Sequence, residues 1–173
     1  MDVGGSARPG ARWYLVHAKT GREAAAEAQL RRQDFTTFLP LSLRTVRHAR
    51  KIETRAGAYF PGYLFVELDL ERDRWRAVNS TIGVVRLVMA RERPLPAPRG
   101  LVEALKAQAD ARGLLDLSRG LGPGDAVSVL AGPFAGQFGV IDQLRGPDRV
   151  RVLLDLMNRE LGVEVGRETI AGA

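Results

Sequence analysis

Residues 59–70 read Tyr-Phe-Pro-Gly-Tyr-Leu-Phe-Val-Glu-Leu-Asp-Leu. Side chains of a strand point alternately to its two faces. A strand over 62–70 therefore places its aliphatic residues, Leu64, Val66, Leu68 and Leu70, on one face. The other face carries Tyr63, Phe65, Glu67 and Asp69. We predict that the aliphatic face is core and that a helix or a partner covers the mixed face.

The sequence around this strand predicts alternating strands and helices. Aromatic and β-branched residues favour strands at 12–18, 35–40 and 83–89, and a basic hairpin over 43–55 with its tip at 48–51. Strong helix formers favour helices at 22–34 and 99–112, with a short one at 72–79. Prolines in 91–98 predict a loop that joins no ladder. The order indicates an α+β sandwich with an antiparallel sheet.

The pattern changes beyond residue 112. Glycine and proline are frequent in 113–123, and short strands follow at 127–130, 139–144, 150–156 and 161–165, enough for a small β-barrel. We therefore predict four parts: a disordered start at 1–11, a sandwich domain at 12–112, a linker at 113–123 and a barrel at 124–173.

Charge separates the two halves. Residues 1–112 carry 20 Lys and Arg against 12 Asp and Glu, a net of +8, whereas residues 113–173 carry 6 against 8, a net of −2. A basic half is typical of nucleic-acid binding. No apolar run approaches the roughly 20 residues of a membrane span, so we expect a cytoplasmic protein. The absence of cysteine excludes disulfides and cysteine-based zinc sites.

Three segments together resemble the NusG family, including its specialised RfaH-like paralogues. They are Trp13-Tyr-Leu15 with Lys19-Thr-Gly21, the run from Tyr59 to Val66, and a KOW-like pattern in which Gly124-Asp125 precedes Gly132–Gly136 and Gly139-Val140. The resemblance runs from 12 to 169. It implies an NGN-type domain, a KOW barrel of SH3-like fold, and a factor that suppresses pausing or termination of transcription.

The resemblance also implies partners for the first domain. The mixed face would bind the clamp helices of the largest RNA polymerase subunit through Trp13, Tyr63 and Phe65, and the segment Arg74-Trp75-Arg76 would reach the opposite jaw. The alternative is packing: Trp13 or the second helix covers both aromatics, and Trp75 anchors the short helix to the sheet.

Nucleic acid is the second implied partner. In RfaH-like members the displaced non-template DNA strand faces positions that correspond here to Lys19, Arg22, Gln29, Arg32, Gln33 and Thr81. Lys and Arg bind phosphates and Gln can bind a base edge; the alternative is a solvated helix face. The hairpin cations Arg44, Arg47, Arg50 and Lys51 could follow upstream duplex DNA or simply keep a strand edge soluble.

For the barrel, the resemblance implies ribosomal protein S10, with Phe134, Phe138, Leu153 and Met157 as candidate contacts. The alternative for the two phenylalanines is that they cap a small core. The segment 155–161 looks more like the RfaH-like branch, some members of which refold this domain as a helical hairpin. Because Gly and Pro in 132–147 disfavour helix, we predict a stable β domain.

Nothing in the sequence indicates an enzyme or a cofactor. His17 and His48 lie in different elements without a nucleophile, and the carboxylates Glu67, Asp69, Glu71 and Asp73 lack a metal-binding loop. We expect a monomeric transcription factor. An RNA-binding, ribosome-associated KOW protein is the alternative, and a metal-dependent nuclease is a third hypothesis.

Overall fold

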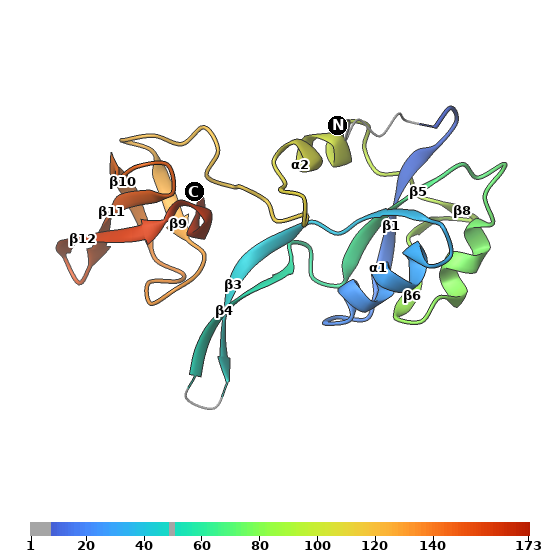
Figure 1. Cartoon of the computed structure of the whole chain (residues 1–173), viewed down its shortest axis with the longest axis horizontal. Helices are drawn as coiled ribbons and strands as arrows, with labels where there is room; N and C mark the ends of the chain where they lie inside the picture. Colours follow the sequence, from blue (N-terminus) through green and yellow to red (C-terminus); the bar gives the residue numbers. More distant parts are fainter. Residues whose placement is uncertain (1–7, 49–50) are drawn as a thin grey trace. The chain divides into compact units, whose positions relative to one another are not determined.

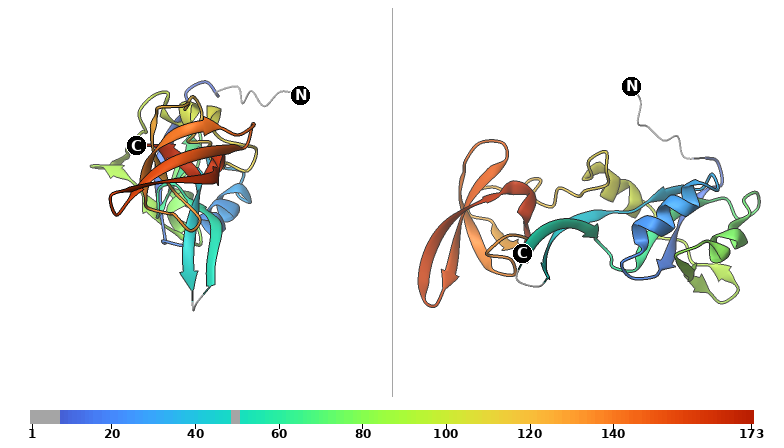
Figure 2. Two further views of the ribbon diagram at one scale, coloured as in Figure 1. Left: turned by 90° about the vertical axis from the view of Figure 1, so that its left-hand side faces the viewer. Right: turned by 60° about the horizontal axis from the view of Figure 1, so that its bottom comes forward.

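The computed structural model describes residues 8–48 and 51–173, which form two compact units. The first contains 8–41 and 58–107, and the second contains 42–48, 51–57 and 108–173. Figures 1 and 2 show the elements of each. Most of the predicted disordered start, Arg50, and the side chains of Arg47 and His48 lie outside the description.

The first unit is built on a four-stranded antiparallel sheet. Its order is β2-β5-β1-β6, formed by Thr36–Phe38, Tyr63–Leu68, Arg12–Ala18 and Val84–Leu87. This unit also holds the two-stranded sheet of β7 (Met89–Ala90) and β8 (Arg93–Pro94), whereas the hairpin of β3 (Leu41–His48) and β4 (Lys51–Ala58) groups with the second unit. Helices are α1 (Glu23–Arg31), α2 (Leu101–Ala107) and the 3₁₀ helix η1 (Trp75–Ser80).

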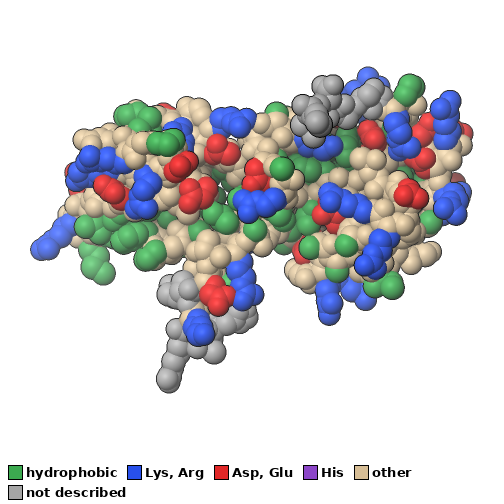
Figure 3. Space-filling model, viewed as in Figure 1, with side chains coloured by type: hydrophobic (Ala, Val, Ile, Leu, Met, Phe, Trp, Pro, Cys, Tyr) green, Lys and Arg blue, Asp and Glu red, His purple; other side chains and the backbone are tan. Residues whose placement is uncertain are grey.

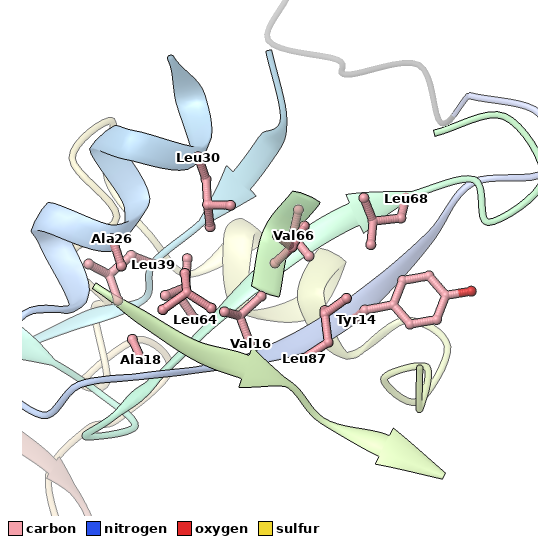
Figure 4. Packing of buried hydrophobic residues seen from close by; sticks show 12 residues of the cluster. Tyr14, Val16, Ala18, Ala26, Leu30, Leu39, Leu64, Val66, Leu68 and Leu87 are labelled. Atoms are coloured by element: carbon pink, nitrogen blue, oxygen red, sulfur yellow. The ribbon is translucent and has the colours of Figure 1, made fainter. Parts of the chain in front are cut away.

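The aliphatic face of β5 is the core, as its alternation predicts. Leu64, Val66 and Leu68 are fully buried together with Val16 of β1 and Leu30 of α1. Figure 4 shows Ala26 and Leu30 pointing from α1 toward this face. Helix α1 therefore covers one face of the sheet.

One buried carboxylate joins α1 to the sheet at the Phe-Pro-Gly turn. Glu23 is 7% exposed, and its Oε1 accepts the Gly62 backbone N–H at 2.7 Å. The Gly62 carbonyl in turn accepts the Ala18 N–H at 2.8 Å. Gly62 has φ +81°, which glycine adopts without the strain that a side chain would bring. The start of α1, the end of β1 and the start of β5 thus meet at one residue.

The predicted and observed elements differ most clearly at three places. Helix α1 stops at Arg31 and not at Asp34, because tighter bonds such as Gln33 N–H to Leu30 O follow it and Asp34 is left-handed, at φ 66°. Helix α2 stops at Ala107, because Asp110 Oδ1 accepts the N–H groups of Arg112 and Leu114 and turns the chain.

The proline segment is the third difference. Pro94 lies in β8 opposite Met89, and Pro96 bridges to Tyr14, so the prediction that this segment joins no ladder is wrong. A proline still offers a carbonyl acceptor, and the neighbouring residues supply the donors: Leu95 N–H bonds Val88 O and Ala97 N–H bonds Trp13 O, both at 2.8 Å.

Besides the β3–β4 hairpin, the second unit holds a five-stranded antiparallel sheet, in the order β12-β11-β10-β9-β13, curled around its own core (Figure 1). The strands are Arg159–Gly166, Arg149–Leu156, Phe138–Leu144, Ala126–Val129 and Ile170–Gly172, with the 3₁₀ helix η2 at Arg167–Thr169. The prediction of a β domain here is confirmed. Within the predicted linker, Leu115 and Ser118 are buried, and Arg167 donates to the carbonyl oxygens of Ser118 and Leu121.

Replacing Glu23 by Ala should leave the Gly62 N–H buried without an acceptor. We expect a loss of about 2 kcal/mol in the free energy of unfolding of the first unit, and a smaller loss for Glu23→Gln, which keeps an acceptor oxygen. Urea unfolding followed by tryptophan fluorescence measures this, since both tryptophans, Trp13 and Trp75, lie in that unit. Glu103→Ala, at an exposed glutamate of α2, is the control; an equal loss there would contradict the explanation.

Candidate partner-binding surface

The face of the sheet opposite α1 carries the aromatic side chains. Three cross-strand pairs of β1 and β5 line it: His17 with Tyr63, Leu15 with Phe65, and Trp13 with Glu67. The His17 and Tyr63 rings stack with centroids 5.1 Å apart. Helix α2 and the proline segment before it lie along this face, since Leu95, Ala97 and Leu101 contribute to the same pocket as Leu15 and Phe65.

That pocket has a volume of about 240 Å³ and is almost entirely apolar. Its lining, all in the first unit, is Leu15, Phe60, Tyr63, Phe65, Leu95, Pro96, Ala97, Pro98 and Leu101. Leu95 is 46% exposed and Leu101 is 36% exposed. An open apolar hollow rimmed by exposed leucines is the kind of surface that a partner side chain or helix fills.

The two predicted aromatic contacts differ in exposure. Tyr63 is half-buried and lines the pocket, as a contact residue would. Phe65 is only 3% exposed, so it is packed inside the unit, as its alternative predicts. It packs between Phe38, at a centroid distance of 6.4 Å, and Phe60, at 6.2 Å. Phe65 therefore forms the floor of the pocket. The packing alternative named Trp13 or a helix as its cover, and the structure places Phe38 and Phe60 against it, with Leu101 of α2 lining the same pocket.

Trp13 lies to the side of this pocket. It is half-buried, and the ammonium group of Lys106 sits 4.3 Å from its ring centroid and 5.6 Å from that of Phe38. These cation–π contacts hold the end of α2 on the sheet. Trp13 lines a second hollow of about 460 Å³ with Glu67, Arg99 and Glu103, among others.

In the segment 74–76, the two arginines are exposed and the tryptophan is packed. Trp75 is half-buried and packs on the core, which agrees with its predicted alternative as an anchor. The Arg76 guanidinium lies 4.4 Å from its ring centroid. Arg74 is exposed beside Gln33 in a hollow of about 220 Å³, so the structure brings one predicted jaw residue next to one predicted DNA residue.

Most of the predicted DNA-binding residues are exposed or half-buried, but Thr81 is buried. Lys19, Arg22 and Arg32 are exposed, and Gln29 is half-buried. Thr81 is only 6% exposed, and its hydroxyl is used internally: it donates to Ala77 O at 3.0 Å and accepts from Gln33 Nε2 at 2.9 Å. Thr81 thus positions Gln33. Figure 3 shows cations and carboxylates interspersed over the visible surface, with no single basic stripe. Arg44 is half-buried and Lys51 exposed in the hairpin.

In the second unit, the four predicted contacts are not equivalent. Phe134 packs against the core of the curled sheet, as its alternative predicts. Phe138 is 67% exposed and Met157 98% exposed. Leu153 is half-buried opposite Val140, on the outer face of the sheet. Met157 has φ 54°, an uncommon conformation for methionine at an exposed turn.

The carboxylates in 67–73 contact arginine side chains and backbone N–H groups of the protein itself. Arg8 donates to both oxygens of Asp73, at 3.3 and 3.0 Å, and lies 3.6 Å from Glu67. Burial raises the pKa of Asp73, but the Asp69 backbone N–H and Arg8 outweigh this and hold it below its usual value. Burial also raises the pKa of Tyr14. Among the described residues, no group of three or more potential metal ligands gathers at one place.

Sequence reasoning missed several residues of the pocket. Phe60, Leu95 and Leu101 were assigned no function, and His17 was considered only for acid–base chemistry. The signal available was two leucines among prolines in 94–101, an apolar composition unusual for a solvated loop. Within the described ranges, no helix is long and apolar enough to cross a membrane.

Comparison with known proteins shows which proteins the chain is similar to. The family model "Transcription termination factor nusG" matches residues 11–106. The chain is 31% identical to the transcription termination/antitermination protein NusG of Thermus thermophilus, covering 88% of this chain and 94% of that protein. It is 29% identical to NusG of Deinococcus radiodurans, covering 92% and 97%. The solved structure "Domain interaction in Thermotoga maritima NusG" matches at 20% identity and a TM-score of 0.36, covering 94% and 97%.

The Asp73–Arg8 pair predicts a pH dependence. Because the pKa of Asp73 is lowered on folding, its carboxylate stabilises the first unit above the unfolded pKa of about 4, and this contribution is lost as the pH falls through the lower folded value. Between pH 6 and pH 2 we expect the wild type to lose about 1 kcal/mol more stability than Asp73→Asn, measured by tryptophan fluorescence. Asp34→Asn, at an exposed carboxylate, is the control; identical pH profiles for all three would rule out this role.

Proposed function

The chain belongs to the NusG family of transcription termination and antitermination proteins, and from this premise we propose that its first unit binds the clamp helices of the largest RNA polymerase subunit. As a family member the chain is a transcription factor. Bound across the clamp, it would suppress pausing or termination. The apolar pocket between the sheet and α2 carries this proposal.

Three properties of the pocket suit a helical partner. Its lining is apolar, so burying the side chains of an amphipathic helix there releases water from both surfaces. Its floor is rigid, because Phe65 is packed between two other rings. Tyr63 stands at its edge, where a ring can bury apolar area while its hydroxyl remains accessible to water.

The exposed cations of the first unit support a contact with the non-template DNA strand. Lys19, Arg22 and Arg32 are free to meet phosphates, and Gln33 is held in place by Thr81. In this proposal Gln33 supplies any sequence preference, and Thr81 acts only by positioning it. Arg74, beside Gln33, extends the same cationic surface.

The second unit supports a separate interaction. Phe138, Leu153 and Met157 leave apolar surface accessible on the curled sheet, which suits binding of a protein such as ribosomal protein S10 and coupling to translation. Phe134 belongs to the core and is no longer a proposed contact. We also propose that residues 155–161 are RfaH-like. The apolar surface of Phe138, Leu153 and Met157 is present when the second unit is folded as a β domain, as it is here.

A binding assay with core RNA polymerase tests the pocket. We expect Leu95→Asp to weaken binding of the full chain by at least about tenfold, because it places a charge at the rim of an apolar contact. Tyr63→Ala should weaken binding in the same way. Leu144→Asp is the matched control, since Leu144 is 44% exposed, against 46% for Leu95, and lies in the second unit.

Circular dichroism should show that all three variants are folded, which is expected because none of the changed side chains is fully buried. Equal binding by wild type, Leu95→Asp and Tyr63→Ala would show that the pocket is not the contact. No binding by the wild type would remove the polymerase proposal itself.

A further inference from the structure

Tyr63 also lines another, smaller hollow. Its volume is about 210 Å³, and its lining is His17, Tyr63, Arg86, Val88 and Met89. Arg86 of β6 stands opposite His17 of β1 in the ladder, so its position is set by the sheet. We call this the Arg86 hollow.

The Arg86 hollow carries positive charge without a counter-charge. No carboxylate is among the residues that line it or the apolar pocket. Arg86 is exposed, and within the described part of the chain it forms no ion pair, unlike Arg8, Arg72 and Arg93. A guanidinium at the edge of an apolar surface is suited to bind a carboxylate through two parallel hydrogen bonds.

The apolar pocket and the Arg86 hollow adjoin at Tyr63, which lines both. Its ring is held by the stack on His17. Side chains three or four residues apart on a helix lie about 5–6 Å from each other, on one face. One helix could therefore place an apolar side chain in the pocket and the next side chain of the same face in the Arg86 hollow.

We infer that Arg86 binds an Asp or Glu of the partner helix, located one turn from the apolar side chain that fills the pocket. The inference rests on the proposed function and adds the chemistry of the partner: an apolar stripe with a carboxylate beside it. The pair would select this register and orientation of the helix, since a shifted helix would leave the carboxylate on an apolar surface.

A nucleic-acid phosphate is the other anion that an arginine could meet. The Arg86 hollow adjoins the apolar pocket, and this favours a protein carboxylate. A phosphate backbone has no apolar side chain that could fill the pocket. Binding to core polymerase free of nucleic acid separates the two, since a phosphate contact would then contribute nothing.

The test measures the affinity of the full chain for nucleic-acid-free core RNA polymerase. We expect Arg86→Ala to weaken binding about fivefold, Arg86→Glu by at least about tenfold, and Arg86→Lys about twofold. The effect of Arg86→Glu should shrink as salt rises from 0.1 to 0.5 M, because screening weakens the repulsion. Arg159→Glu, at an exposed arginine of β12, makes the same change of net charge and should bind like wild type.

The outcomes separate this inference from the proposed function. If Arg86→Glu binds like wild type while Tyr63→Ala does not, the pocket is the contact and the inference about Arg86 is wrong. Equal losses for Arg86→Glu and Arg159→Glu would show a general charge effect, which also overturns it. If Arg86→Glu binds normally without nucleic acid and weakly only with it, the anion is a phosphate. Failure of the wild type to bind would remove the proposed function.

Discussion

The hydrogen bond from the Gly62 backbone to the buried carboxylate of Glu23 fixes the first unit. It joins the start of α1 to the start of β5, and the carbonyl of the same glycine holds the end of β1. With α1 fastened there, Ala26 and Leu30 cover the aliphatic face of the sheet. The other face is left to the aromatic side chains. The Phe-Pro-Gly turn therefore sets which face of the sheet is core and which is free to bind.

Packing and binding thus use the two faces of one strand. Leu64, Val66 and Leu68 stabilise the unit, while Tyr63 and Phe65 line the pocket on the reverse. Phe65 serves both purposes, since it is buried among phenylalanines and still forms the pocket floor. A change at Phe65 would affect folding as well as binding, whereas exposed Leu95 and half-buried Tyr63 allow binding to be changed by itself.

Period-two alternation predicted the core face of β5, and helix formers predicted α1, because both patterns are local. The ends of the helices were wrong because they depend on single contacts, such as the bonds that Asp110 makes to Arg112 and Leu114. The site was predicted in part. Alternation identified Tyr63, but the burial of Phe65 depends on Phe38 and Phe60 from other segments. Leu95 and Leu101 join the pocket only through tertiary packing of the proline segment, which local pattern could not predict.

The central claim is that the pocket between the sheet and α2 receives the clamp helices of RNA polymerase. Photo-crosslinking tests it most directly, with p-benzoylphenylalanine in place of Leu95 in the full chain bound to core polymerase and the crosslinked peptides identified by mass spectrometry. We expect crosslinks concentrated in the clamp helices of the largest subunit, and none there from the same probe at Leu144. Crosslinks from position 95 elsewhere on the polymerase, or the same pattern from both positions, would contradict it.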